Sequence, residues 1–321
     1  MRVCIYGAGA IGGHAAVRLI EAGTSDVSVV ARGAHLRAIQ EHGLRLRTGG
    51  REIVAHPVAA TEAPETLPAQ NLVVVTLKAP ALPDHARAIA RLLAPDGVAL
   101  FVSNGIPWWW NHGGSGEPLP LLDPDRHLWD ELGPERALGG VVLSTNEVVE
   151  PGVVLHRAHN RWIVGEPDGS SSARLDAVLA LLRTTSLGVE HAVDIRRAVW
   201  EKLVLNVAMS GTAALTRLQT WQVVGEPSLR RIVGGLVEET VAVAQALGWD
   251  LRDTVEVEAT LRRFEGPGVT PSMLQDVLLG RPMEVEAIAG QVQAFGQDAG
   301  VATPVLDVLV PLLRGLSRSA E

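Results

Sequence analysis

The sequence predicts an α/β domain of the doubly wound, Rossmann type followed by an all-α domain. Strand and helix patterns alternate through the first half of the 321-residue chain, which is typical of a parallel sheet. A glycine-rich turn, GAGAIG, follows the first strand pattern. From Asp194 onward every segment has helical periodicity, so we expect domains at 1–192 and 193–321.

The first domain follows from its apolar patterns in order. Gly49 and Gly50 separate two β patterns and predict a hairpin. The apolar runs at 72–77 and 98–103 are typical of strands buried on both faces. Strands are expected at 2–6, 27–31, 44–47, 53–56, 72–77, 98–103, 138–144, 152–156 and 161–165, and helices at 10–22, 34–42, 83–93 and 173–184.

A Trp/Pro/Gly-rich stretch, about 106–136, interrupts this alternation and contains the run Trp108–Trp110. It is too long for a simple connection, so we interpret it as an insertion or a functional loop. Its tryptophans could form hydrophobic cover, a dimer contact or a lid over the substrate, and we favour cover or contact over the lid.

The second domain is predicted to contain helices only, with Gly or Pro at the joints. These helices are expected at 195–209, 228–247, 272–279, 285–299 and 304–316.

Composition limits the function classes. The net charge of −8 argues against a nucleic-acid partner, because phosphate binding needs a basic surface. No apolar run approaches the ~18 residues of a membrane span. The single cysteine, Cys4, forms no disulfide framework, and a lone strand before the glycine turn leaves no room for a removable signal. We therefore expect a cytoplasmic protein without a membrane partner.

The glycine turn predicts a dinucleotide site. Gly7 permits the tight turn, Gly9 lets backbone approach the pyrophosphate, and Gly12 lets the helix pack close to the strand. A glycine-rich turn in an ordinary βαβ unit is the alternative. The residues expected at the cofactor are Gly7, Ala8, Gly9, Ala10, Ile11 and Gly12.

Arg32 lies after the second strand, where an NAD-binding fold usually has an acid. A guanidinium pairs with a 2′-phosphate that an acid would repel, so we predict NADPH/NADP rather than NAD. The alternative is that Arg32 is one solvated arginine among 26.

The chain has only two lysines, Lys78 and Lys202, in a composition that otherwise uses arginine. Lys78 and Asn104 end neighbouring strands at the carboxyl edge, where they would face cofactor and substrate. Lys202, Asn206 and Ser210 are spaced i, i+4, i+8 on one face of an apolar helix. Strand-end caps and a snorkelling lysine are the alternatives.

The stretch PSMLQDVLLGRPMEVEAI places Ser272, Glu284 and Glu286 near helix starts. By itself this pattern is typical of a cap and of acids interacting with the helix dipole.

Taken together, these motifs resemble the ketopantoate reductase (2-dehydropantoate 2-reductase) family. The matching stretches are GAGAIGG, VVVTLKA, the NG of FVSNGIP, WEKLVLN with TAAL, and SMLQD with E-V-E, in order along nearly the whole chain. The resemblance implies that the Lys202 position donates a proton. It also implies that Lys78 and Asn104 lie near cofactor and substrate, and that Asn206, Ser272 and Glu284 contact or orient the substrate. Ser210 departs from the family's usual asparagine, Pro271 replaces one of a serine pair, and the tryptophan run is additional.

The expected activity is NADPH-dependent reduction of a 2-oxo acid, most simply ketopantoate to pantoate as in pantothenate biosynthesis. Lys202 and Glu284 are the expected catalytic residues, and Asn104, Asn206, Ser210 and Ser272 the substrate residues. No metal is expected, and a homodimer is a candidate assembly. The alternatives are a related reductase of a bulkier carbonyl compound and a non-catalytic NADPH-binding sensor.

Overall fold

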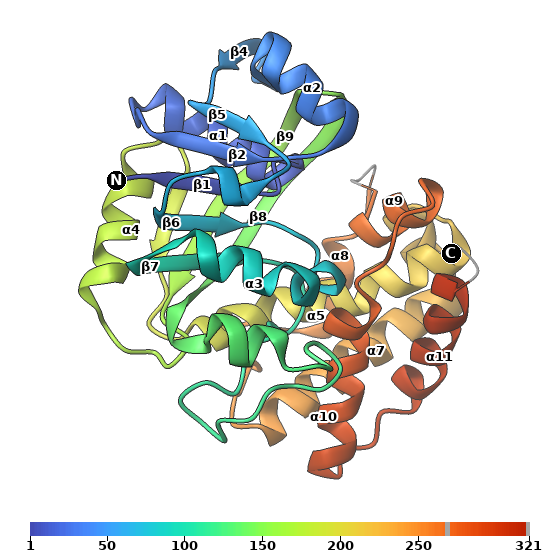
Figure 1. Cartoon of the computed structure of the whole chain (residues 1–321). Coiled ribbons are helices and arrows are strands. Elements are labelled where there is room, and N and C mark those ends of the chain that lie inside the picture. The colour runs from blue at the N-terminus through green and yellow to red at the C-terminus, as the bar shows by residue number, and fades with distance from the viewer. Residues whose placement is uncertain (267–269, 319–321) are drawn as a thin grey trace. The chain divides into compact units, whose positions relative to one another are not determined.

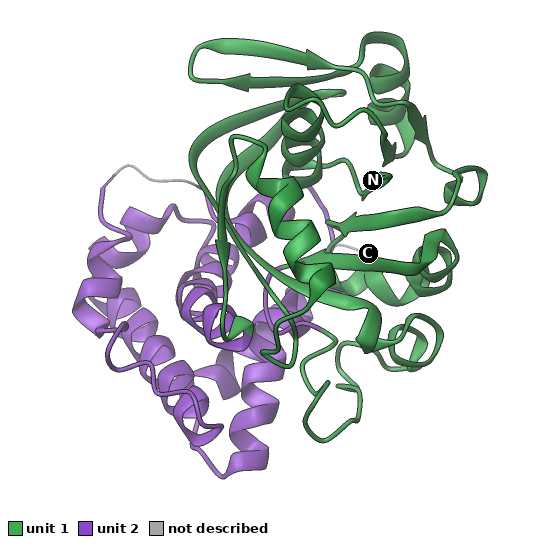
Figure 2. Cartoon of the chain, turned by 90° about the vertical axis from the view of Figure 1, so that its left-hand side faces the viewer, with its two compact units in different colours: residues 1–103, 108–195 green, residues 104–107, 196–321 purple. Residues whose placement is uncertain are grey.

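The computed structural model describes residues 1–266 and 270–318. The chain forms two compact units, residues 1–103 with 108–195 and residues 104–107 with 196–321 (Figure 2). We call them the sheet unit and the helical unit. The short segment 104–107 belongs with the helices, although the chain on both sides of it belongs with the sheet. Sequence periodicity does not predict that residues 104–107 join the helical unit, because this assignment depends on the distant residues that the segment contacts.

The sheet unit is built on a ten-stranded sheet with the order β4-β3-β9-β8-β7-β6-β1-β2-β5, and β10 pairs with β9 (Figure 1). From β5 to β8 neighbouring strands are parallel, whereas β3–β4 and β8–β9 are antiparallel. The sheet is therefore mixed, and the predicted α/β fold class is confirmed. The strands are β1 (Val3–Tyr6), β2 (Val27–Val30), β3 (Leu44–Thr48), β4 (Arg51–Ala55), β5 (Ala59–Thr61), β6 (Gln70–Val75), β7 (Leu93–Val102), β8 (Ala137–Glu150), β9 (Val153–Gly165) and β10 (Gly188–His191).

The strand order reverses beside β1. β2 and β5 lie on one side of β1 and β6 lies on the other, and between β2 and β5 the chain forms the hairpin β3–β4 at the opposite edge of the sheet. Doubly wound sheets bind ligands outside the carboxyl ends of the strands at such a reversal. The helices of this unit are α1 (Ala10–Glu21), α2 (Gly33–His42), α3 (Leu82–Leu92) and α4 (Ala173–Arg183).

The sequence prediction was wrong about the strands after residue 136. Three short pieces were expected, but the chain forms two long antiparallel strands, β8 and β9, that turn at Gly152 with φ of +74°. Register shifts occur between Leu143 and Thr145 and again before Glu150, so the alternation of apolar and polar residues is broken within each strand. The short strands β5 and β10 were also missed.

The consecutive tryptophans 108–110 of the insertion are core residues. Trp108, Trp109 and Trp110 are each at most 5% exposed. The Trp108 ring meets Phe101 edge-to-face with 5.3 Å between ring centroids. A side chain at Gly139 would collide with the Trp109 ring, so that glycine leaves room for the indole. These contacts favour hydrophobic cover over a lid.

The helical unit contains α5 to α11, and the predicted all-α class is confirmed. Helix α5 runs seven residues further than expected, while the six-residue helices α6 and α8 lie in segments that were expected to be helical but were given no bounds. A π-helical turn, Glu286–Gly290, precedes α10 where one continuous helix was expected. The helices are α5 (Ile195–Thr216), α6 (Thr220–Gly225), α7 (Pro227–Ala246), α8 (Val257–Arg262), α9 (Ser272–Leu278), α10 (Gln291–Ala299) and α11 (Pro304–Arg318).

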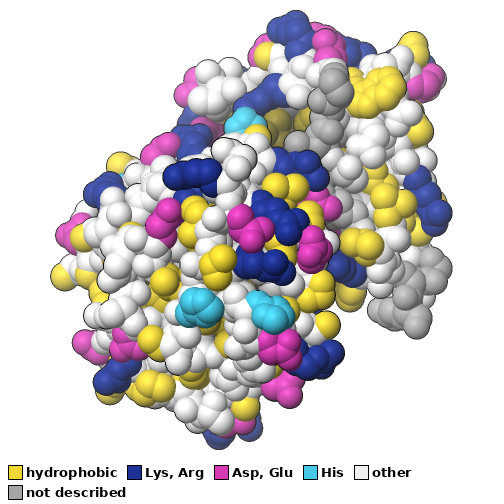
Figure 3. Space-filling model, turned by 90° about the horizontal axis from the view of Figure 1, so that it is seen from above, with side chains coloured by type: hydrophobic (Ala, Val, Ile, Leu, Met, Phe, Trp, Pro, Cys, Tyr) yellow, Lys and Arg dark blue, Asp and Glu magenta, His cyan; other side chains and the backbone are white. Residues whose placement is uncertain are grey.

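Basic side chains lie among acidic and apolar ones on the face drawn in Figure 3. Such mixing accords with a chain in which 36 acidic residues accompany 28 basic ones. None of the helices in residues 1–266 and 270–318 combines the length and the apolar character that a membrane crossing requires.

Candidate active site

The glycine turn joins β1 to α1 and has the geometry of a phosphate cradle. Gly7 has φ of +101°, which favours glycine. A Cβ at Gly12 would lie 2.2 Å from the Gly7 carbonyl oxygen, so only glycine lets α1 start so close to β1. A Cβ at Gly9 would meet no atom within 4 Å, which leaves the turn open above the helix start. The first-turn N–H groups of α1 can bind an anion there, and these residues fit a dinucleotide.

His35, a residue that sequence reasoning missed, supports this turn. Its Nε2 lies 2.7 Å from the Ala8 carbonyl oxygen, and its Nδ1 accepts a hydrogen bond from the Gly152 N–H at 3.0 Å. The imidazole is therefore the neutral tautomer that carries its proton on Nε2. Burial lowers the pKa of His35 and so favours that neutral form. His35 thus ties the glycine turn to the β8–β9 turn.

Arg32 and Lys78 follow the two strands that flank β1. Arg32 is exposed at the N-cap of α2, two residues after β2. Lys78 is half-buried three residues after β6. At the end of β1 itself, the Tyr6 hydroxyl bonds His85 Nδ1 at 3.0 Å, a pair that the sequence prediction did not include. The carboxyl edge of the sheet unit therefore carries the glycine turn with a cation from each neighbouring strand.

The helical unit holds a chain of three polar side chains. The Lys202 ammonium donates to Asn104 Oδ1 at 2.8 Å, and Asn104 Nδ2 donates to Glu284 Oε2 at 3.1 Å. The amide orientation is fixed, because its oxygen faces the cation and its NH₂ faces the anion. Glu284 is buried, with only 5% of the residue exposed. Sequence reasoning placed these residues at one site but did not predict that Asn104 bridges the other two.

The backbone around Asn104 explains this placement. Ile106 N–H donates to the Ala287 carbonyl oxygen at 2.8 Å. Gly105 has φ of +83°, and a Cβ there would lie 2.3 Å from the same oxygen. The glycine of the Asn-Gly pair thus permits the loop to pack directly on the turn that follows Glu284.

The burial of Lys202 shifts its proton affinity. Desolvation lowers the pKa of the ammonium from 10.5 to about 8, and the negative charge of Glu284 partly opposes this shift. Among the residues that the structure describes, Asn104 accepts one of the three ammonium N–H groups, and the other two can bind a substrate. The group can therefore donate both a hydrogen bond and a proton near neutral pH.

The expected substrate residues lie on two helices. Asn206 and Ser210 follow Lys202 on α5 at helical spacing, half-buried and 4% exposed respectively. Ser272 is the exposed first residue of α9. The alternative that Ser272 caps this helix is wrong, because Pro271 is the N-cap residue and no side chain caps the helix start. Within the described residues, Ser272 makes no hydrogen bond to Lys202, Asn104 or Glu284.

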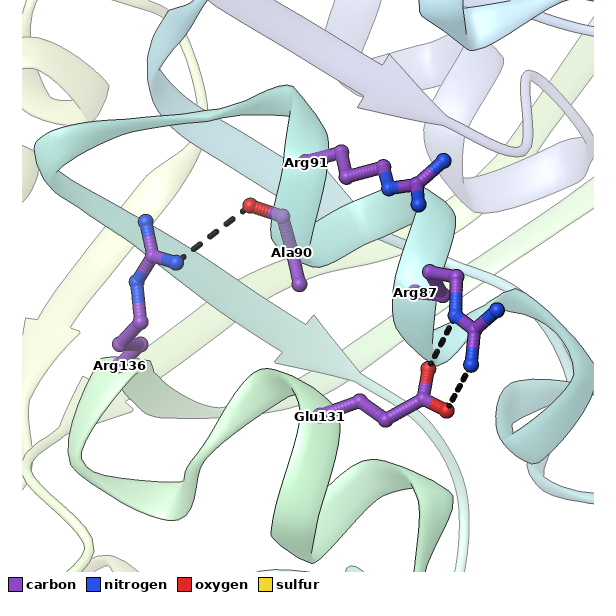
Figure 4. A pocket seen from close by; sticks show the side chains of 5 residues that line it. All are labelled: Arg87, Ala90, Arg91, Glu131 and Arg136. Atoms are coloured by element: carbon purple, nitrogen blue, oxygen red, sulfur yellow. Dashed lines mark hydrogen bonds and ion pairs between the residues drawn. The ribbon is translucent and has the colours of Figure 1, made fainter.

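A pocket of about 390 Å³ lies elsewhere, between α3 and the insertion (Figure 4). Its lining residues are Arg87, Ala90, Arg91, Glu131 and Arg136. Arg87 pairs with both oxygens of Glu131 at 3.1 and 2.8 Å, and Arg136 donates to the Ala90 carbonyl oxygen. None of the predicted site residues lines it, and two of its four charged groups, Arg87 and Glu131, bind each other.

Comparison with known proteins gives the family. Residues 3–169 match the model described as "Ketopantoate reductase PanE/ApbA", and residues 194–317 match its C-terminal counterpart. A 2-dehydropantoate 2-reductase from Mesorhizobium japonicum is 38% identical, covering 99% of this chain and 98% of that protein. A ketopantoate reductase candidate of known structure from Ralstonia solanacearum MolK2 is 34% identical with a TM-score of 0.91, covering 99% and 98% of the two chains. A D-mandelate dehydrogenase in complex with NADH and anilino(oxo)acetate shares the fold at 22% identity and a TM-score of 0.83, covering 100% and 99%. The resemblance seen in the sequence is thereby confirmed, and the chain belongs to the ketopantoate reductase PanE/ApbA family.

Proposed function

We propose that this protein catalyses the NADPH-dependent reduction of 2-dehydropantoate to pantoate. The observation that carries the proposal is the Lys202–Asn104–Glu284 chain, in which a polarised amide holds an ammonium whose pKa is about 8. Desolvation lowers the pKa of any buried lysine, and a general acid works best with a pKa near the operating pH, so a buried lysine held by Asn104 suits the role of proton donor. The 38% identical relative from M. japonicum supports the substrate assignment.

The cofactor residues are proposed in the sheet unit. The turn from Gly7 to Gly12, with Ala8, Ala10 and Ile11, would hold the pyrophosphate at the start of α1. Arg32 would pair with the 2′-phosphate, which favours NADPH over NADH. Lys78, three residues past β6, would bind the cofactor from the other side of β1.

Bound NADPH supplies the hydride that goes to the carbonyl carbon of the oxo acid. As negative charge develops on the carbonyl oxygen, Lys202 donates a hydrogen bond and then a proton from Nζ, so that a hydroxy acid forms. At pH 7 a group with a pKa of about 8 is about nine-tenths protonated, so the donor form dominates. Solvent returns the proton to the amine after each turnover, and Asn104 and Glu284 keep the Nζ in place.

Asn206, Ser210 and Ser272 are the proposed substrate contacts. Asn206 and Ser210 lie on the same face of α5 as Lys202, one and two turns further along. An amide and hydroxyls can bind the carboxylate and the hydroxyl of the substrate. A bulkier carbonyl substrate is the second candidate, because Ser210 is smaller than the asparagine usual in this family.

The deciding experiment follows NADPH oxidation at 340 nm with ketopantoate and a panel of other 2-oxo acids. We expect ketopantoate to give the highest kcat/KM. A bulkier acid with a tenfold higher kcat/KM would replace the substrate assignment, and no oxidation with any acid would favour the NADPH-sensor alternative.

The variant Lys202→Ala tests the proposed proton donor. It should lower kcat by about 10²–10⁴ with NADPH still bound. Turnover within threefold of wild type would remove Lys202 from this role. A homodimer and a cytoplasmic location stay predictions.

A further inference from the structure

An ion pair that the proposed mechanism does not use lies directly beside Glu284. Glu286 is the first residue of the π-helical turn Glu286–Gly290. Arg314 of α11 donates two parallel hydrogen bonds to the Glu286 carboxylate, from Nε to Oε1 and from Nη2 to Oε2, each 2.7 Å long. Each side chain is about one-third exposed, so the pair is shielded on most sides. Two-pronged pairs of this kind fix geometry as well as charge.

The turn itself is shaped to accept this carboxylate. A Cβ at Gly290 would lie 2.2 Å from Glu286 Oε2 and 3.3 Å from Arg314 Nη2. Glycine at 290 therefore leaves the space that the paired groups fill. Single π-helical turns inside helices are rare and occur frequently at functional sites.

The same turn contacts Glu284 and the loop that carries Asn104. Glu284 lies two residues before Glu286, and its carbonyl oxygen accepts a bond from Ile288 N–H at 3.1 Å. Ala287, the residue after Glu286, holds the Asn104 loop through its carbonyl oxygen and Ile106 N–H. A displacement of this turn would therefore move the acceptor that binds Asn104 and the loop that carries Asn104 together.

We propose that Glu286 and Arg314 are positioning residues that lock the π-helical turn so that Glu284 and Asn104 meet Lys202 in the reactive geometry. The assignment rests on the proposed function of Lys202 as proton donor. Neither residue touches the reacting atoms, and their effect passes through the Glu284–Asn104–Lys202 chain. Loss of the pair would separate the negative charge of Glu284 from Lys202, which lowers the pKa of the ammonium and loosens its position.

The chain offers a direct readout, because Lys78 and Lys202 are its only lysines. Lysine labelled with carbon-13 at Cε would give two side-chain NMR signals, and Lys202→Ala identifies one of them. The pKa of Lys202 can then be titrated in the intact protein without any substrate. Arg314→Met removes the pair, Glu286→Gln keeps its shape without the charge, and Arg314→Lys keeps the charge without the two-pronged geometry.

Arg230→Met is the matched control. Arg230 also makes ion pairs in the helical unit, with Glu258 and Glu265, and is 28% exposed compared with 35% for Arg314. It lies on α7 and makes none of the hydrogen bonds of the Lys202 chain. Its removal therefore measures the cost of losing a partly exposed ion pair in this unit.

In Arg314→Met and Glu286→Gln we expect the pKa of Lys202 to fall by about half a unit or more, because Glu284 moves away. We expect kcat with the oxo acid to fall about 10- to 100-fold at unchanged NADPH affinity. Arg314→Lys should have a Lys202 pKa and a kcat between those of these variants and those of wild type. Arg230→Met should match wild type in both the Lys202 pKa and kcat. A Lys202 pKa within 0.2 of wild type in both Arg314→Met and Glu286→Gln would overturn the proposal, whatever their melting temperatures. Wild-type protein without turnover would instead refute the proposed function, while the NMR titration would still decide the positioning role.

Discussion

Replacing Glu284 by glutamine removes a negative charge from the Lys202 chain but leaves an oxygen that can accept the Asn104 hydrogen bond. The two bonds of the bridge are 2.8 and 3.1 Å long, and the oxygen and nitrogen of an amide lie about 2.3 Å apart. The ammonium and the carboxylate are therefore at most about 8 Å apart. At an effective dielectric constant of about 20, this distance corresponds to about 2 kcal/mol, or about 1.5 pKa units.

The sign of the effect follows from the role of Lys202. A proton donor is active below its pKa and inactive above it, so wild-type kcat should fall through pH of about 8. Without the charge of Glu284, which raises this pKa, the fall should occur about 1 to 1.5 units lower. At pH 8 the variant should be roughly tenfold slower than wild type, while the two should differ little at pH 6.

The assay is the pH profile of kcat for NADPH oxidation, with the carbon-13 titration of Lys202 beside it. Glu258→Gln is the control, because Glu258 is an exposed acid of the same unit that pairs with Arg230. Its profile should coincide with that of wild type. If kcat of Glu284→Gln still falls through pH 8, or falls at a higher pH, the electrostatic account of the site is refuted.

Three further predictions concern the sheet unit. Arg32→Ala should weaken NADPH binding roughly 10- to 100-fold while leaving NADH binding within about twofold, because only NADPH carries the 2′-phosphate; equal losses in fluorescence titrations would contradict the cofactor assignment. His35→Leu should leave the Ala8 carbonyl without its partner and raise the Kd for NADPH roughly tenfold at unchanged kcat; an unchanged Kd would show that the glycine turn holds its shape without it. His14 is fully buried, and burial lowers its pKa to about 3, so the unfolded chain binds an extra proton as the pH falls below about 6.5. Wild type should therefore lose about 1.7 kcal/mol of unfolding free energy from this group between pH 6.5 and 5, and His14→Gln should abolish that loss in urea unfolding; identical slopes would exclude the effect.

The sequence was informative wherever the physical requirement is local. The turn from Gly7 to Gly12 could be read because Gly7 needs a positive φ and Gly12 must leave space beside the Gly7 carbonyl oxygen, which are demands within a few residues. The hairpin at Gly49 and Gly50 forms as expected for the same reason. The strands β8 and β9 were misread as fragments because their register shifts break the period on which strand prediction depends.

The same contrast separates the parts of the candidate site. Helical spacing alone put Lys202, Asn206 and Ser210 on one face of α5, since the i, i+4, i+8 rule needs no partner. Asn104 bonds residues 98 and 180 positions away in the chain, and His35 bonds one 117 positions away. No local pattern encodes such pairs, because they depend on where the chain returns after long loops.

The sequence by itself thus determined the fold class, the glycine turn, the arginine after the second strand and the family motifs, all of which depend on patterns within short segments. Only the tertiary structure decided that residues 104–107 pack with the helices, that Asn104 bridges Lys202 to Glu284, and that Arg314 grips Glu286 beside them. The physical reason is that burial and partners, which set the pKa of Lys202, exist only once distant segments have come together.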